Sequence, residues 1–310
     1  MKRFLGLKIG CIATAILLIL SLGKGASAGQ RGSTMNFLIL GVDEAAENTD
    51  VISILRLDSS EGKVTVLQIP RDTYCNADVY GHKINHLFSS ARAKGEERDE
   101  AVMLLRKFLS EQLSIEFDGH VMLNGADFMR LVDAIGGVEV ELDEEIALYN
   151  GKDLVLRLGK GKNRLDSKSA MIFVRHRAGY AMGDIDRLRM QRIFAEGLAR
   201  TVTGSLDMRA IVRLISVFKE LETDIPISTA ISLIGNRSAY KGVSPQIFTL
   251  RGEGIKGENG IWYYALNRYE NALLCSEIFK TERESFDSKM RFLNTKEKSF
   301  EKIYFRTPEK

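Results

Sequence analysis

Residues 36–43 read Asn-Phe-Leu-Ile-Leu-Gly-Val-Asp, and this apolar run ending in an acid decides the fold class. A continuous run of this length, without alternation of polar and apolar residues, predicts a strand buried on both faces. Two further apolar runs follow at 51–57 and 64–69. The Asp-Ser-Ser-Glu-Gly sequence at 58–62 has turn chemistry, so we predict that these two runs form a hairpin.

Helical and strand patterns alternate in the rest of the body. Helical spacing is present at 96–113, 126–135, 167–174 and 187–203, and strand patterns are present at 120–123, 138–142 and 246–250. Strands mixed with helices of this length predict an α/β fold, a three-layer α/β/α sandwich on a mixed central β-sheet.

The N-terminus has the pattern of a membrane segment. Three bases within the first eight residues precede an uncharged run from Ile9 to Leu22. Counted from Phe4, the apolar stretch reaches about 19 residues, which suits a retained anchor. The small residues Ala26-Ser27-Ala28 suit a cleavage site, so a cleaved and secreted form is the alternative. The basic flank predicts a single-pass protein of the cell membrane with its body outside.

The sequence therefore divides into three parts. Residues 1–30 are predicted to be a short cytoplasmic end, an anchor or signal, and a linker. Residues 31–280 are predicted to form the extracellular catalytic domain. Residues 281–310 are highly charged and nearly free of apolar pattern, which indicates a tail.

The charge of the body argues against a nucleic-acid partner. The chain has 44 bases, 41 acids and a formal net charge of +3, and four of the bases but no acid lie within residues 1–29. The remaining body is therefore near neutrality, whereas a protein that coats duplex DNA keeps a strongly basic body.

Of the three cysteines, Cys75 and Cys275 lie in the body. We predict that they are unpaired small hydrophobes, a disulfide being the alternative.

Charged residues stand at the ends of the predicted strands, where open α/β sheets bind ligands. Asp43 follows the first strand, Asp50 precedes the second, and Arg71-Asp72 follow the third after Pro70. Proline fixes its own φ and restricts its neighbour, so we expect Arg71 and Asp72 to be held rigidly. The alternatives are a turn or cap role for the two acids at 43 and 50, and a local ion pair for Arg71 and Asp72.

Residues 174–192 contain five arginines and no lysine. The planar guanidinium group binds phosphate oxygens through two parallel hydrogen bonds, so a cluster of arginine alone favours a phosphate ligand. On a helix over 187–203, Arg187 and Gln191 share a face. Asp184 lies near the start of this helix, where the helix dipole favours an acid and where an anion can bind. The alternative is a solvated helix face whose arginines pair with local acids.

Taken together, these segments resemble the LytR–CpsA–Psr (LCP) family. Seven family boxes occur in consistent order over residues 34–200. They are Gly41-Val42-Asp43, Asp50, Gln68–Thr73, Lys83–His86, Leu131–Val138, Arg175–Arg177 and Gly183–Gln191. The sequence departs from the family beside the two acids, where the family often has arginines but residues 44–46 and 48–49 contain none. It also departs before Gln191, where the family usually has arginine and residue 190 is Met.

The resemblance implies a membrane-anchored phosphotransferase that moves a glycopolymer from a polyprenyl-pyrophosphate carrier to peptidoglycan. It implies that Asp43 and Asp50 hold Mg²⁺ (or Mn²⁺), and that an apolar tunnel holds the polyprenyl tail. The residues implied to grip the pyrophosphate are Arg71, Arg175, Arg177, Arg187 and Gln191. Because the attacking hydroxyl needs a proton acceptor, Asp184 is our first candidate for the base and Asp72 the second. A polyprenyl-pyrophosphate phosphatase and a non-enzymatic, lipid-binding regulator of the envelope are the alternatives.

Overall fold

The computed structural model describes residues 34–43, 45, 47–77, 81–175, 184–204, 206–234, 243, 245–257 and 260–280. The predicted membrane segment and the charged tail lie outside these residues, and the predicted domain boundaries stay predictions. Within the described part of the chain, no helix is long and apolar enough to cross a membrane.

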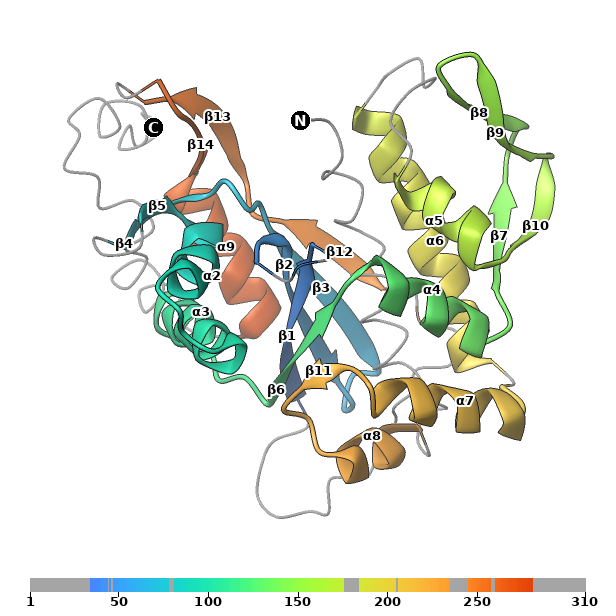
Figure 1. Cartoon of the computed structure of the whole chain (residues 1–310), viewed down its shortest axis with the longest axis horizontal. Coiled ribbons are helices and arrows are strands. Elements are labelled where there is room, and N and C mark those ends of the chain that lie inside the picture. The colour runs from blue at the N-terminus through green and yellow to red at the C-terminus, as the bar shows by residue number, and fades with distance from the viewer. Residues whose placement is uncertain are drawn as a thin grey trace.

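A six-stranded mixed sheet forms the centre of the molecule (Figure 1). Its order is β11-β6-β1-β2-β3-β12. The strands are β1 (Thr34–Val42), β2 (Thr49–Asp58), β3 (Lys63–Ile69), β6 (Gly119–Leu123), β11 (Glu222–Thr223) and β12 (Gln246–Thr249). β2 pairs antiparallel with both β1 and β3, whereas β6 runs parallel to β1 and β12 runs parallel to β3. The predicted hairpin of the second and third strands is confirmed.

Helices cover both faces of this sheet, because the apolar strands alternate their side chains between two cores. Phe37 and Ile39 enter one core with α4 (Gly125–Ala134), α5 (Ser167–Arg175), α6 (Asp184–Thr203) and α7 (Met208–Phe218). Leu38 and Leu40 enter the other core with α2 (Ile84–Ala93), α3 (Arg98–Leu113) and α9 (Arg268–Phe279). The remaining described helix, α8 (Ile227–Ile234), packs beside α7 (Figure 1). The mixed α/β fold on a mixed central sheet is confirmed.

Among the described residues, four two-stranded ribbons accompany the central sheet. They pair β4 (Tyr74–Ala77) with β5 (Gly81–Lys83), β7 (Val138–Leu142) with β10 (Gly161–Leu165), β8 (Ile146–Asn150) with β9 (Asp153–Leu158), and β13 (Gly252–Lys256) with β14 (Trp262–Leu266). Of these strands, the sequence predicted only β7. β9 shows why, since five of its six residues are exposed or half-buried and give no alternating pattern.

Two predicted boundaries were wrong by a few residues, and both shifts concern site residues. β2 begins at Thr49, so Asp50 lies inside the strand rather than before it. α6 begins at Asp184, three residues before the predicted start, so this acid is the first residue of its helix. Cys75 and Cys275 are both buried and free, as predicted, and burial raises the pKa of each thiol to about 12.

Candidate functional site

The predicted acids and Arg71 meet at one edge of the central sheet. Because β1, β3, β6 and β12 all run in the same direction, their carboxyl ends lie together at this edge. β2 runs the opposite way and begins there, with Ile52 facing Ile69 at the end of β3. Asp43 follows β1, Asp50 is the second residue of β2, and Arg71 follows β3 by two residues.

Asp50 and Arg71 form an ion pair at the centre of this edge. The Arg71 guanidinium donates through Nη1 to Asp50 Oδ1. The Asp50 side chain is only 4% exposed, and that of Arg71 is 26% exposed. A buried carboxylate needs a compensating charge, because its desolvation would otherwise cost several kcal/mol. Asp50, predicted to bind the metal, and Arg71, predicted to bind the pyrophosphate, therefore contact each other directly.

The segment 70–73 that carries Arg71 is fixed on both sides by backbone hydrogen bonds. Thr73 N donates to Pro70 O at 2.9 Å and closes a turn. Asn85 N, at the start of α2, donates to Arg71 O at 3.3 Å, and Tyr264 N of β14 donates to Asp72 O at 2.8 Å. This arrangement agrees with the rigidity expected from Pro70.

Asp72 links Arg71 to Lys83, a residue for which the sequence predicted no role. Its Oδ2 lies 3.6 Å from Arg71 Nε, so the local ion pair considered as an alternative is present. Its Oδ1 accepts a 2.8 Å hydrogen bond from Lys83 Nζ, which also lies 5.6 Å from the centre of the Tyr263 ring. Lys83 lies in one of the family boxes of the sequence. Tyr263 is far away in the chain and reaches the site because β14 pairs with Thr73 through Tyr264.

The pKa of His86 is lowered by its surroundings at this edge. Burial lowers its pKa, and the positive charge of Lys83 lowers it further, against the opposing effect of Asp72. The sequence predicted no role for this residue, because the neighbouring residues in the chain do not indicate what a single histidine packs against.

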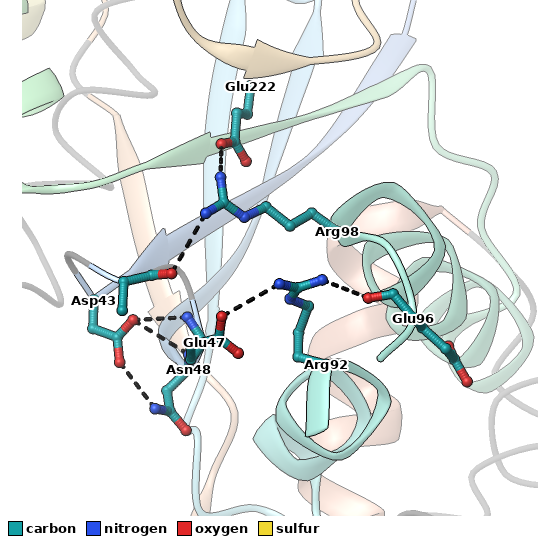
Figure 2. Close-up of polar contacts among 8 residues, drawn as sticks. Asp43, Glu47, Asn48, Arg92, Glu96, Arg98 and Glu222 are labelled. Atoms are coloured by element: carbon teal, nitrogen blue, oxygen red, sulfur yellow. Dashed lines mark hydrogen bonds and ion pairs between the residues drawn. The ribbon is translucent and has the colours of Figure 1, made fainter. Parts of the chain in front are cut away.

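Asp43 has the turn role that we considered as its alternative. Its Oδ1 accepts hydrogen bonds from Glu47 N at 2.9 Å and Asn48 N at 3.4 Å, and its Oδ2 accepts one from Asn48 Nδ2 at 2.9 Å (Figure 2). The carboxylate is half-buried and closes the loop between β1 and β2. A carboxylate has about four acceptor positions, so these three bonds leave room for a further ligand.

The donor set at this edge suits a magnesium ion. Among the described residues, no group of three or more His, Cys, Asp or Glu side chains converges as a metal site. Mg²⁺ is commonly held by one or two carboxylates together with water and substrate phosphates, so two aspartates provide a sufficient protein contribution. The role of Asp43 and Asp50 as metal ligands stays a prediction.

The arginine-rich stretch is described only in part. Arg175 is half-buried at the end of α5. Arg177 and the side chains of Asp184, Arg187 and Gln191 lie outside the described part of the structure. Arg192 is 76% exposed and pairs with Glu196 one helical turn away at 3.1 Å, which matches the solvated helix face that we kept as an alternative.

The fold and this edge define a mixed α/β domain that gathers acids and arginine at the carboxyl ends of its strands. The model of the LytR–CpsA–Psr family matches residues 22–279, and the chain belongs to this family. The family prediction is thereby confirmed.

The relatives include named transferases. The chain is 28% identical over 253 residues to the polyisoprenyl-teichoic acid–peptidoglycan teichoic acid transferase TagU of Oceanobacillus iheyensis, with 79% of this chain and 75% of that protein covered. The structure of TagV from B. subtilis superposes with a TM-score of 0.60 at 21% identity, covering 83% of this chain and 99% of that one. TagT bound to LIIa-WTA gives a TM-score of 0.60 at 22% identity, covering 83% and 95%. These names agree with the predicted LCP-type transferase, and the structural likeness confirms the fold.

Proposed function

We propose that this chain transfers an anionic glycopolymer, of the teichoic acid class named for its relatives, from a polyprenyl-pyrophosphate carrier to peptidoglycan. The observation that carries the proposal is the Asp50–Arg71–Asp72–Lys83 series of ion pairs at the sheet edge of a chain that belongs to this family. The planar guanidinium group of Arg71 can bind a phosphate through two parallel hydrogen bonds. The carboxylates beside it are of the kind that bind a divalent cation.

The transfer exchanges the phosphoanhydride bond of the carrier pyrophosphate for a phosphodiester bond to peptidoglycan. An acceptor hydroxyl of peptidoglycan attacks the phosphorus that bears the glycopolymer, and a new P–O bond forms there. The bond from that phosphorus to the bridging oxygen breaks, and polyprenyl monophosphate leaves with the electron pair. Catalysis of this step is mainly positioning and stabilisation of negative charge, which several arginines provide.

Arg71 would bind the pyrophosphate together with Arg175, Arg177, Arg187 and Gln191. Of these, Arg71 has the most complete support, because its backbone and its guanidinium group are both fixed at the sheet edge. Asp43 and Asp50 would hold Mg²⁺ or Mn²⁺, which when bound neutralises phosphate charge and the leaving oxygen. Asp50 binds Arg71 on one oxygen, so a metal would share this carboxylate with the arginine.

Asp184 is the better candidate for the base that accepts the hydroxyl proton. The second candidate, Asp72, already pairs with Lys83 at 2.8 Å and with Arg71 at 3.6 Å. A carboxylate stabilised by two cations has a weaker tendency to take up a proton. We therefore assign Asp72 to the positioning of Arg71 and Lys83, and keep Asp184, the first residue of α6, as the base.

The predicted membrane segment would hold this domain at the outer face of the cell membrane, beside its lipid-linked donor. The charged edge would face the carrier headgroup, and the polyprenyl tail would lie against the apolar interior.

The decisive assay compares donor cleavage with and without the acceptor. Full-length protein in detergent receives a lipid-linked pyrophosphate glycopolymer and Mg²⁺, with or without peptidoglycan oligomers, and release of polyprenyl monophosphate is followed by mass spectrometry. We expect release to depend on the acceptor and to match the amount of joined product. Release at the same rate without acceptor would identify a phosphatase, and no release in either arm would favour a binding protein.

A further inference from the structure

The loop between β1 and β2 carries Asp43 and leads directly into Asp50. The Asp43 carboxylate closes the loop from inside through the amides of Glu47 and Asn48. Glu47 and Asn48 are themselves exposed. The direction of the Asp43 carboxylate therefore depends on the contacts that other elements make with the loop.

Arg92, in the last turn of α2, fastens one side. Its Nη2 lies 3.3 Å from Glu47 Oε1, and its Nη1 donates to the Glu96 carbonyl in the turn between α2 and α3 (Figure 2). The Arg92 side chain is 18% exposed and that of Glu47 is 47% exposed, so salt screens this ion pair in part. Arg92 thus connects the loop to a rigid helical corner.

Arg98, the first residue of α3, fastens the other side. Its Nη2 donates to the Ala45 carbonyl at 3.5 Å, and its Nη1 pairs with Glu222 of β11 (Figure 2). The two arginines approach the loop from neighbouring helices, and Arg98 also connects it to the far edge strand of the sheet.

Arg92 and Arg98 lie in a part of the chain for which the sequence predicted no site residue. The loop itself has no arginine, since residues 44–46 read Glu-Ala-Ala and residues 48–49 read Asn-Thr. Arg92 and Arg98 bring positive charge to the same place from α2 and α3, and they bind the loop at two separate points.

The geometry points to Arg92 and Arg98 as positioning residues that hold the 43–48 loop, and with it the Asp43 carboxylate, at the sheet edge. Neither residue needs to touch the donor for this role. The importance of the carboxylate for catalysis rests on the proposed function, whereas the holding of the loop does not.

Hydrogen exchange tests the holding directly in full-length protein in detergent, without donor, acceptor or metal. The amides of Glu47 and Asn48 report on the loop because they donate to Asp43. We expect Arg92→Ala and Arg98→Ala each to speed exchange of a peptide over 43–50 by about tenfold or more. Arg92→Lys should restore part of the protection. The matched control is Arg106→Ala, which removes an α3 ion pair to Asp224 at 2.6 Å and should leave this peptide unchanged.

A second readout connects the loop to the reaction. With the transfer assay, we expect both alanine variants to raise the Mg²⁺ concentration for half-maximal rate several-fold, with most of the maximal rate regained at saturating metal. Arg106→Ala should keep the wild-type Mg²⁺ dependence.

The two experiments test separately whether the arginines hold the loop and whether the loop affects Mg²⁺ dependence. Wild-type exchange in both alanine variants would overturn the inference outright. Faster exchange with unchanged Mg²⁺ dependence would reduce both arginines to structural residues, which also overturns the positioning role. A wild-type protein that transfers no polymer would refute the proposed function, and the exchange result would still decide whether the arginines hold the loop.

Discussion

Arg71→Ala removes the cation that neutralises a buried carboxylate, so we expect it to lower stability as well as abolish transfer. Asp50 is 4% exposed, and losing one partner of a fully buried pair costs roughly 3–5 kcal/mol. Arg71 is 26% exposed, and water that enters in its place screens part of this cost. We therefore expect a loss of about 2 kcal/mol in the free energy of unfolding.

A double-mutant cycle separates the ion pair from the ligand grip. Asp50→Asn keeps the shape of the side chain and removes its charge, so Arg71→Ala should cost less in that background. The difference measures the coupling of the pair, and we expect roughly 1–2 kcal/mol. Arg71→Lys is the matched control, because it keeps the charge but loses the planar fork. It should retain most of the stability and still lose most of the transfer activity.

Urea denaturation followed by circular dichroism gives these free energies, and the melting temperature provides a check. A loss of about 2 kcal/mol corresponds to a fall of roughly 4–8 °C for a domain of this size. Two results would refute the reasoning. One is an Arg71→Ala variant as stable as wild type, and the other is a cycle in which the two single losses simply add.

Three further predictions concern Lys83, two histidines and the metal. Lys83→Met should lower the transfer rate about tenfold with a change in melting temperature of only a few degrees, because Asp72 keeps Arg71 as a partner; a wild-type rate would remove Lys83 from the site. Burial lowers the pKa of both His86 and His120, so the folded state favours their neutral forms. The contribution of the two neutral histidines to the free energy of unfolding should therefore be fully present above their unfolded-state pKa of about 6.5 and be lost as the pH drops below it. His120→Gln should flatten this pH profile. Asp43→Asn should raise the Mg²⁺ requirement of transfer at least tenfold; an unchanged metal titration would contradict the metal assignment.

The strands of the site could be predicted because each is a continuous apolar run that ends at a charged residue. The runs at 36–41 and 64–69 gave β1 and β3 nearly to their observed bounds, and the turn at 58–62 fixed how β2 and β3 pair. That arrangement alone brings Asp43, Asp50 and the segment after Pro70 to one edge.

Contacts between segments far apart in the chain could not be predicted in the same way. Nothing local to Lys83 indicates that it lies between Asp72 and the Tyr263 ring, since β14 is placed there by pairing with a residue nearly 200 positions earlier. Likewise, the sequence suggested a metal pair and a separate arginine grip, whereas Asp50 and Arg71 share an ion pair. Spacing identifies residues that lie on one edge, but it does not say which of them touch.

The lipid that accompanies the protein tests the central claim most directly, which is that the charged sheet edge binds the pyrophosphate of a polyprenyl carrier. Full-length protein and its Arg71→Ala variant would be extracted from membranes under the same conditions, and the retained lipid would be identified and quantified by mass spectrometry. We predict that the wild-type protein retains a polyprenyl-pyrophosphate species and that Arg71→Ala retains at least tenfold less. Ordinary phospholipid alone on both proteins, or equal amounts of the polyprenyl species on both, would contradict the account.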